Sequence, residues 1–255
     1  MITRSDIREL YREFRHWNSG AISPNEILFI RNLIRRHKPK SFLEIGTGAG
    51  VSTGFIARFL HENSGNRVTT IDIKETSETD DTKLTGFLTE EIYPDNTVEI
   101  EYHRGVCSTF LCDNPNEFNA SLIDANNGHP WPTIDAICVL PFLSTNAILI
   151  HHDLQLYKNP NSRGVGPKVL FDRIPEGSRV IIPDKHKNMF YIAVTNGHKE
   201  FKDSLANSIR VPWTVKNRIP KKRIEEINSI IQTHWDIELL NAFEEAIDKF
   251  NHPRP

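Results

Sequence analysis

The sequence predicts an α/β fold: a seven-stranded, mainly parallel sheet with an antiparallel last strand and helices on both faces. Two observations predict this fold. Short apolar segments alternate with amphipathic helical segments from residue 41 onward, and a glycine-rich turn joins the first of these strands to the helix after it. Strands separated by helices indicate βαβ units, in which the strands run parallel.

The composition is that of an ordinary globular protein. Of its 255 residues, 38% are hydrophobic and 25% are charged, which allows a sizeable core. The net charge of −2 gives no global basic field and argues against nucleic acid as a partner. No apolar run approaches the ~20 residues of a membrane span, the charged N-terminus lacks a signal-peptide core, and the three cysteines form no Cys-x-x-Cys pair. We therefore expect a cytoplasmic protein without a membrane partner.

Residues 1–40 are expected to form an N-terminal helical lid. The stretch 2–38 has a helical pattern, and the motif Ser-Pro-Asn-Glu at residues 23–26 is a helix start. Its serine suits the N-cap, its proline the first helical position, and its glutamate closes a capping box. The residues that then recur at helical spacing and predict a buried face are Ile27, Ile30 and Ile34.

Residues 41–200 are the expected core domain. The seven predicted strands are Ser41–Gly46, Arg67–Ile73, Val98–Tyr102, Ser121–Asp124, Ala147–His151, Arg179–Ile182 and Phe190–Val194. Only residues 183–189 separate the last two strands, and this link is too short for a parallel crossover. These two strands are therefore expected to pair antiparallel.

Residues 201–255 are expected to form a C-terminal helical extension. Its apolar residues cannot all face solvent without leaving a large apolar patch, so the extension packs either on the core or on a second copy of the chain as a homodimer. A basic segment, residues 216–223, precedes these helices. Such a segment is usually a solvated loop, and the alternative is a site for an anionic acceptor or RNA. The apolar residues at helical spacing are Ile224, Ile227, Ile231, Trp235, Leu239, Phe243, Ile247 and Phe250.

The glycine-rich turn is the sequence Glu-Ile-Gly-Thr-Gly-Ala-Gly at residues 44–50. Glycines at this position let the backbone turn tightly and approach a ligand at the N-terminus of the next helix. A dinucleotide fingerprint requires glycine at residue 51, where this chain has Val51. The segment also lacks the Gly-Lys-Ser/Thr of a P-loop, so it is neither of these phosphate-binding motifs.

The next predicted strand ends in an acid, Asp72. A carboxylate at this position can accept hydrogen bonds from both hydroxyls of a ribose. Such a site fits NAD and other adenosine-containing cofactors equally, so the glycine spacing decides between them.

The combination Glu-x-Gly-x-Gly-x-Gly followed by this acid resembles the first motifs of class I, Rossmann-like methyltransferases that use S-adenosylmethionine. The resemblance implies a cofactor site for a ligand with an ammonium group, a ribose and no pyrophosphate. The residues that it implies for this site are Glu44, Gly46, Thr47, Gly48, Gly50, Asp72, Ile73 and Asp124.

Later segments resemble a narrower family, the small-molecule O-methyltransferases that include macrolide-sugar and cephalosporin tailoring enzymes. The resemblance spans roughly residues 20–200 and rests on segments 118–131, 148–153 and 164–169. This chain departs from the family at Ala125, where the family has glycine, in a longer segment before His129, and at residues 144–146, which replace Pro-Gly-Gly.

The resemblance implies catalytic roles at the carboxyl ends of two neighbouring strands. His129 is the first choice as general base, because imidazole titrates near neutral pH. Asp124, His152 and Asp153 match family positions that hold a divalent ion, and a metal site for Mg or Mn is the alternative to a reaction in which His129 acts without metal. In a reaction without metal, His152 is the second candidate base and Asp124 an orienting acceptor.

The predicted function is methyl transfer from S-adenosylmethionine to a hydroxyl of a small molecule, such as a sugar, a phenol or a natural-product intermediate. The alternatives are an N-methyltransferase, a protein or RNA methyltransferase, and a non-catalytic cofactor-binding or scaffolding protein with the same fold. An NAD-dependent oxidoreductase is disfavoured by Val51.

Overall fold

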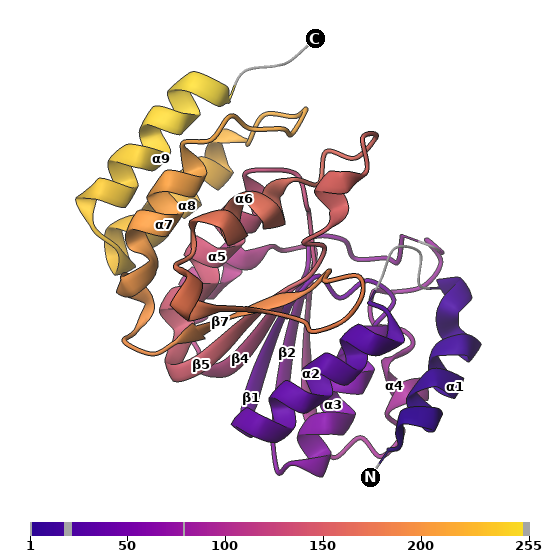
Figure 1. The fold of residues 1–255 in the computed structure, drawn as a ribbon. Coiled ribbons are helices and arrows are strands. Elements are labelled where there is room, and N and C mark those ends of the chain that lie inside the picture. The colour runs from indigo at the N-terminus through magenta and orange to yellow at the C-terminus, as the bar shows by residue number, and fades with distance from the viewer. Residues whose placement is uncertain (1, 18–21, 79, 252–255) are drawn as a thin grey trace. The chain divides into compact units, whose positions relative to one another are not determined.

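The computed structural model describes residues 2–17, 22–78 and 80–251 (Figure 1). The strands form a seven-stranded sheet in the order β3-β2-β1-β4-β5-β7-β6. They are β1 (Ser41–Ile45), β2 (Arg67–Asp72), β3 (Glu99–Arg104), β4 (Phe118–Ile123), β5 (Leu143–His151), β6 (Arg179–Ile181) and β7 (Phe190–Val194). β1 pairs parallel with β2, and β2 with β3, whereas β7 pairs antiparallel with β5 and β6. The predicted fold class, including its antiparallel last strand, is confirmed.

Two strands begin earlier than their hydrophobicity predicts. β4 begins at Phe118 instead of Ser121, and β5 begins at Leu143 instead of Ala147. The added residues of β5 include Thr145 and Asn146, which are exposed. Because these polar side chains face solvent at the start of the strand, they do not show the apolar pattern by which a buried strand is recognised.

The first compact unit comprises Met1–Cys107 together with Phe118–Leu122. Its helices are α1 (Arg4–Phe14), α2 (Pro24–His37), α3 (Val51–Glu62) and α4 (Thr89–Ile92). The capping box of α2 is present, since Ser23 N donates to Glu26 Oε2 (2.6 Å) and Glu26 N donates to Ser23 Oγ (3.4 Å). Residues 18–21 of the predicted helical stretch lie outside the described residues.

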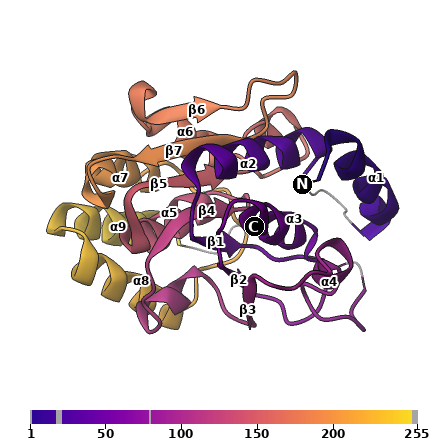
Figure 2. The same cartoon turned by 90° about the horizontal axis from the view of Figure 1, so that it is seen from below.

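Helix α3 is the main support of the glycine-rich turn. Its residues Val51, Phe55, Ile56, Phe59 and Leu60 are all buried, as their spacing predicts. α3 packs against α2 and α4, and Figures 1 and 2 show α2 and α3 side by side. This packing fixes the start of α3, where the candidate cofactor site lies.

The second compact unit comprises Ser108–Glu117 and Ile123–Pro255. Its helices are α5 (Trp131–Val139), α6 (Gly166–Arg173), α7 (Lys202–Ile209), α8 (Lys221–His234) and α9 (Ile237–Phe250). The short 3-10 helices of the chain are η1 (Arg15–Trp17), η2 (Ser108–Cys112), η3 (Leu140–Phe142), η4 (Leu156–Lys158), η5 (Glu176–Ser178) and η6 (His198–Phe201).

The C-terminal extension contains the helices α7, α8 and α9. α9 packs on α7, and α7 and α8 pack on α5 of the same unit (Figure 1). Asp236 caps the start of α9 by accepting from Leu239 N (3.2 Å). The buried Trp235 donates from Nε1 to Ile137 O on α5 (3.1 Å). Most apolar side chains of the extension are therefore buried within this chain. The homodimer, like the division into lid, core and extension, stays a prediction.

Among the described residues, no helix has the length and apolar character that crossing a membrane requires.

Candidate cofactor and acceptor sites

The glycine loop, residues 46–50, connects β1 to α3. The loop glycines have positive φ values, which residues other than glycine rarely adopt. The values are 100° at Gly46, 53° at Gly48 and 91° at Gly50. Gly46 N donates to Ile71 O on β2 (2.8 Å), and Gly50 is the N-cap of α3. The predicted strand–turn–helix geometry is therefore present.

The glycines at positions 48 and 50 serve different purposes. A Cβ built on Gly50 would lie 2.4 Å from Thr89 Oγ1 and 2.7 Å from Gly86 Cα, whereas a Cβ built on Gly48 meets nothing within 4 Å. Gly50 is thus required by the packing of the chain itself. Gly48 leaves open space beside the backbone of the loop, as a cofactor site needs.

Asp72, at the end of β2, holds the glycine loop in place. Its Oδ2 accepts hydrogen bonds from Thr47 N (3.0 Å) and Gly48 N (2.9 Å), and its Oδ1 accepts from Lys74 N (2.8 Å). The carboxylate therefore connects the ends of β1 and β2. Binding of a ribose by Asp72 stays a prediction.

Glu44 lies beneath the loop as a buried carboxylate. Its Oε2 accepts from Thr53 Oγ1 (2.5 Å) and Thr70 Oγ1 (2.7 Å), and Thr47 Oγ1 lies 2.7 Å from Thr70 Oγ1. These bonds connect β1, β2, the loop and α3. They give Glu44 a role in shaping the site, whereas direct contact with a cofactor ammonium stays a prediction.

Ile73, directly after Asp72, is 65% exposed. An apolar side chain left exposed next to a candidate ribose site is available to a ligand. The predicted place of Ile73 in the cofactor site stays a prediction.

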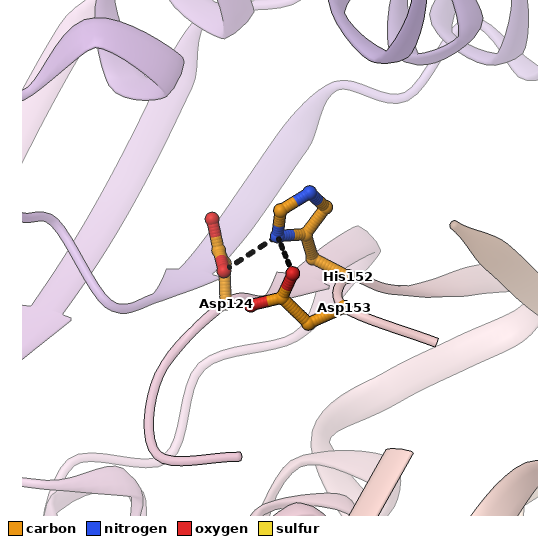
Figure 3. Close-up of side chains that lie close together, drawn as sticks. All are labelled: Asp124, His152 and Asp153. Atoms are coloured by element: carbon orange, nitrogen blue, oxygen red, sulfur yellow. Dashed lines mark hydrogen bonds and ion pairs between the residues drawn. The ribbon is translucent and has the colours of Figure 1, made fainter. Parts of the chain in front are cut away.

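The second unit contains a cluster of two carboxylates and one imidazole, shown in Figure 3. We call Asp124, His152 and Asp153 the Asp124 cluster. His152 Nδ1 lies 3.0 Å from Asp124 Oδ1 and 3.5 Å from Asp153 Oδ1, and the three possible ligand atoms lie within 4.8 Å of one another. The structure therefore brings together the three residues that the sequence predicts as a group.

The surroundings of His152 fix which ring nitrogen carries the hydrogen. Asn188 Oδ1 accepts from Gln155 N (2.9 Å), which orients the amide so that its Nδ2 faces His152 Nε2 at 3.3 Å and Asp153 Oδ1 at 3.2 Å. An amide nitrogen only donates, so His152 Nε2 must be the acceptor. Nδ1 then carries the hydrogen and donates to Asp124.

This arrangement does not fit a metal ion bound by His152. The ring nitrogen that faces both carboxylates is Nδ1, and it could bind a cation only if the hydrogen moved to Nε2. Nε2–H would then face the donor Nδ2 of Asn188. The hydrogen bonds favour a His152–Asp124 pair over a metal centre.

Asp153 turns back toward His152 because its backbone is left-handed, with φ 59°, an uncommon conformation for a residue other than glycine. Its Oδ2 accepts from Asn127 Nδ2 (2.7 Å). Asn127 and Asn188 thus hold Asp153 from two sides. The sequence analysis assigned a role to neither asparagine: Asn127 lies in the segment 118–131 without a role of its own there, and Asn188 belongs to no motif.

His129 lies away from solvent and is bound to the C-terminal part of the chain. It is 0% exposed, its Nε2 donates to Val211 O (3.1 Å), and its N donates to Thr214 Oγ1 (3.0 Å). Burial lowers the pKa of His129 to about 4. This geometry counts against the predicted role of general base and gives His129 a role in tying its loop to residues 211–214.

Comparison with known proteins agrees with this fold and loop. The family described as methyltransferase domain matches residues 43–154, whereas no curated protein matches the chain. The O-methyltransferase from Bacillus cereus in complex with SAH has 20% identity and a TM-score of 0.54, over 76% of this chain and 90% of that chain.

Two further solved structures are similar to the chain. The O-methyltransferase TomG from Streptomyces achromogenes, involved in tomaymycin synthesis and in complex with SAM, has 20% identity and a TM-score of 0.55, over 76% of this chain and 89% of that one. The SAH-bound methyltransferase PaMTH1 from Podospora anserina has 16% identity and a TM-score of 0.55, over 76% and 88%. The predicted enzyme class is borne out by the match of residues 43–154 to the methyltransferase-domain model, and the sheet has the fold of these methyltransferases.

Proposed function

We propose that this protein transfers a methyl group from S-adenosylmethionine to a hydroxyl of a small molecule. The open space at Gly48, the acid at the end of β2 and the exposed Ile73 support the cofactor assignment. Bound there, the cofactor supplies a methyl group on a sulfonium sulfur and leaves as S-adenosylhomocysteine.

The observation that carries the acceptor part of the proposal is the His152–Asp124 pair. The side chain of Asp124 is 17% exposed and that of His152 only 2%. An incoming hydroxyl therefore meets the carboxylate first. Because the His152 Nδ1–H holds Oδ1, the carboxylate has a fixed orientation toward the acceptor.

We assign Asp124 as the proton acceptor. An ionised carboxylate only accepts hydrogen bonds, so Asp124 can bind the acceptor O–H and take its proton as the oxygen–carbon bond forms. His152 is then a positioning residue for Asp124. This assignment replaces His129 as the base, since His129 is fully buried and bonded to Val211.

The test begins with the cofactor. Calorimetry with S-adenosylhomocysteine and with NAD should show binding of the first alone, and mass spectrometry should then find a methylated product among hydroxyl acceptors such as sugars and phenols. Binding without turnover of any acceptor would favour the non-catalytic alternative. Methylation of amines alone would favour an N-methyltransferase, and binding of NAD alone would overturn the proposal.

A further inference from the structure

A basic segment that the proposed reaction does not use lies beside the candidate acceptor site. The backbone N–H groups of Thr214 and Val215 both donate to His129 O, at 2.8 and 3.2 Å. Thr214 Oγ1 donates to Arg163 O (3.0 Å). Residues 214–218, which lead into the basic segment and include its first residues, are therefore bonded through Thr214 and Val215 to the loop of His129 and to the loop of Arg163. We call residues 214–218 the basic loop.

The loop of His129 connects the basic loop to the Asp124 cluster. Val215 Cγ1 lies 2.9 Å from the position of a Cβ on Gly128. The residue before Gly128, Asn127, donates to Asp153 Oδ2 (2.7 Å) and accepts from Gly166 N (3.0 Å). The basic loop is therefore linked to a carboxylate of the cluster through two neighbouring residues: Val215 lies against Gly128, and Asn127 is hydrogen-bonded to Asp153.

Three cations on the connected loops have no acidic partner among the described residues. Arg163, Lys216 and Arg218 are exposed, and none of the ion pairs found among the described residues includes them. Farther along the same basic segment, in α8, Lys221 pairs with Glu225 (3.7 Å) and Arg223 pairs with Glu226 (2.6 Å). The net charge of the chain is −2, so the uncompensated positive charge is local to these loops.

We propose that the methyl acceptor is an anionic small molecule, whose carboxylate or phosphate binds to Arg163, Lys216 and Arg218. This inference rests on the proposed function. Two carboxylates, Asp124 and Asp153, would repel an anion from the place where the hydroxyl must bind. The cations beside them would attract it, so the acceptor is oriented with its anionic group at the basic loop and its hydroxyl at Asp124.

The test compares neutral and anionic members of three matched pairs. They are catechol with 3,4-dihydroxybenzoate, glucose with glucose 6-phosphate, and uridine with uridine 5′-monophosphate, and binding is measured by calorimetry with and without S-adenosylhomocysteine. In at least one pair, wild type should bind the anionic member about tenfold more tightly at low ionic strength, with the preference falling as salt is added. The pair that binds distinguishes a carboxylate from a phosphate.

Two double variants each remove two positive charges, one pair from the basic loop and the other from the start of α8. Lys216→Ala with Arg218→Ala should reduce the preference to about twofold or less, and Lys221→Ala with Lys222→Ala should retain it. Loss of the preference in both double variants would overturn the proposal, as would wild type that prefers no anionic member or binds none. RNA binding that depends on Lys216 and Arg218, without a preference among the small acceptors, would also overturn it.

The measurement without cofactor separates this inference from the proposed function. If S-adenosylhomocysteine fails to bind while the anionic preference persists and depends on the basic loop, the proposed function fails and the anion site stands. If the cofactor binds and the preference is absent, only the anion site fails.

Discussion

The glycine loop and the Asp124 cluster differ in how they are built. The loop is one contiguous segment held largely through its backbone: Thr47 N and Gly48 N donate to Asp72, and Gly48 O and Ala49 O accept from Gly86 N and Leu88 N. The cluster is joined through side chains of separate segments, since His152 contacts Asp124 and Asn188. The cofactor site is thus carried by one recognisable stretch of backbone, whereas the acceptor site is assembled from scattered side chains.

The largest expected effect is at Asp124. Asp124→Asn keeps an oxygen for His152 but removes the proton acceptor, so the single-turnover rate should fall by about 10²–10⁴. Because the sequence also predicts Asp124 as a cofactor residue, the affinity of the variant for S-adenosylhomocysteine, measured by calorimetry, tests that role separately from proton removal. His152→Asn should lower the single-turnover rate less, by about tenfold to a hundredfold, because Asp124 stays in place as the proton acceptor and loses only the hydrogen bond that orients it.

His129→Gln is the matched comparison for this series. Its rate should fall less than that of His152→Asn, because His129 is buried and bonded to Val211. A loss as large as that of Asp124→Asn, with unchanged thermal stability, would restore His129 as the base.

The second prediction separates two glycines of the loop. Gly50→Ala should lower the free energy of unfolding by about 2–4 kcal/mol, because its Cβ meets the backbone of Gly86 at 2.7 Å and φ is 91°. Gly48→Ala, with open space around its Cβ, should cost about 1 kcal/mol of stability but weaken cofactor binding about tenfold. Denaturation and calorimetry on both variants check this, and equal cofactor affinity in Gly48→Ala and wild type would place the cofactor elsewhere.

The same contrast explains what could be predicted from sequence. Apolar periodicity located all seven strands, and the glycine spacing with Asp72 located the loop, because both signals are local. The early starts of β4 and β5 were missed, since residues such as Asn119 and Asn146 carry no strand signal. Asn188 and Thr214 were missed because their partners lie 36 and 85 residues away, where only the folded chain brings them together.

The third prediction concerns Asp135, a buried carboxyl on α5 in the unit that contains the Asp124 cluster. Ser108 Oγ donates to its Oδ1 (2.6 Å), yet burial raises the pKa of Asp135 to about 6. The folded state therefore holds a proton in a pH range where the unfolded state has lost it. Stability from this group is present at low pH and is lost as pH rises to about 6.

Asp135→Asn should therefore be more stable than wild type at pH 8, by about 1–3 kcal/mol at most, and gain little at pH 4. His129 has the opposite dependence, since its lowered pKa makes the folded state less stable as pH falls from about 6.5 to 4. The contribution of His129 to the free energy of unfolding is the same in wild type and in Asp135→Asn, so it cancels when the two proteins are compared. Urea denaturation at the two pH values measures that difference, and a pH-independent difference would mean that folding does not raise the pKa of Asp135.

The smallest expected effect is that of chelation. EDTA should change the rate of methyl transfer by less than about twofold, because the His152 ring nitrogen that faces Asp124 and Asp153 carries a hydrogen. Asn188 enforces this state, since its Nδ2 faces Nε2 of His152 and its Oδ1 is held by Gln155 N (2.9 Å).

Asn188→Asp would replace that donor with an acceptor, allow Nε2 of His152 to carry the hydrogen and free Nδ1 for a cation. The variant should therefore bind Mn²⁺ more tightly than wild type, as paramagnetic resonance of free Mn²⁺ would detect. Loss of wild-type activity in EDTA, with recovery in Mg²⁺ or Mn²⁺, would instead make the Asp124 cluster a metal centre and assign proton removal to metal-bound hydroxyl chemistry.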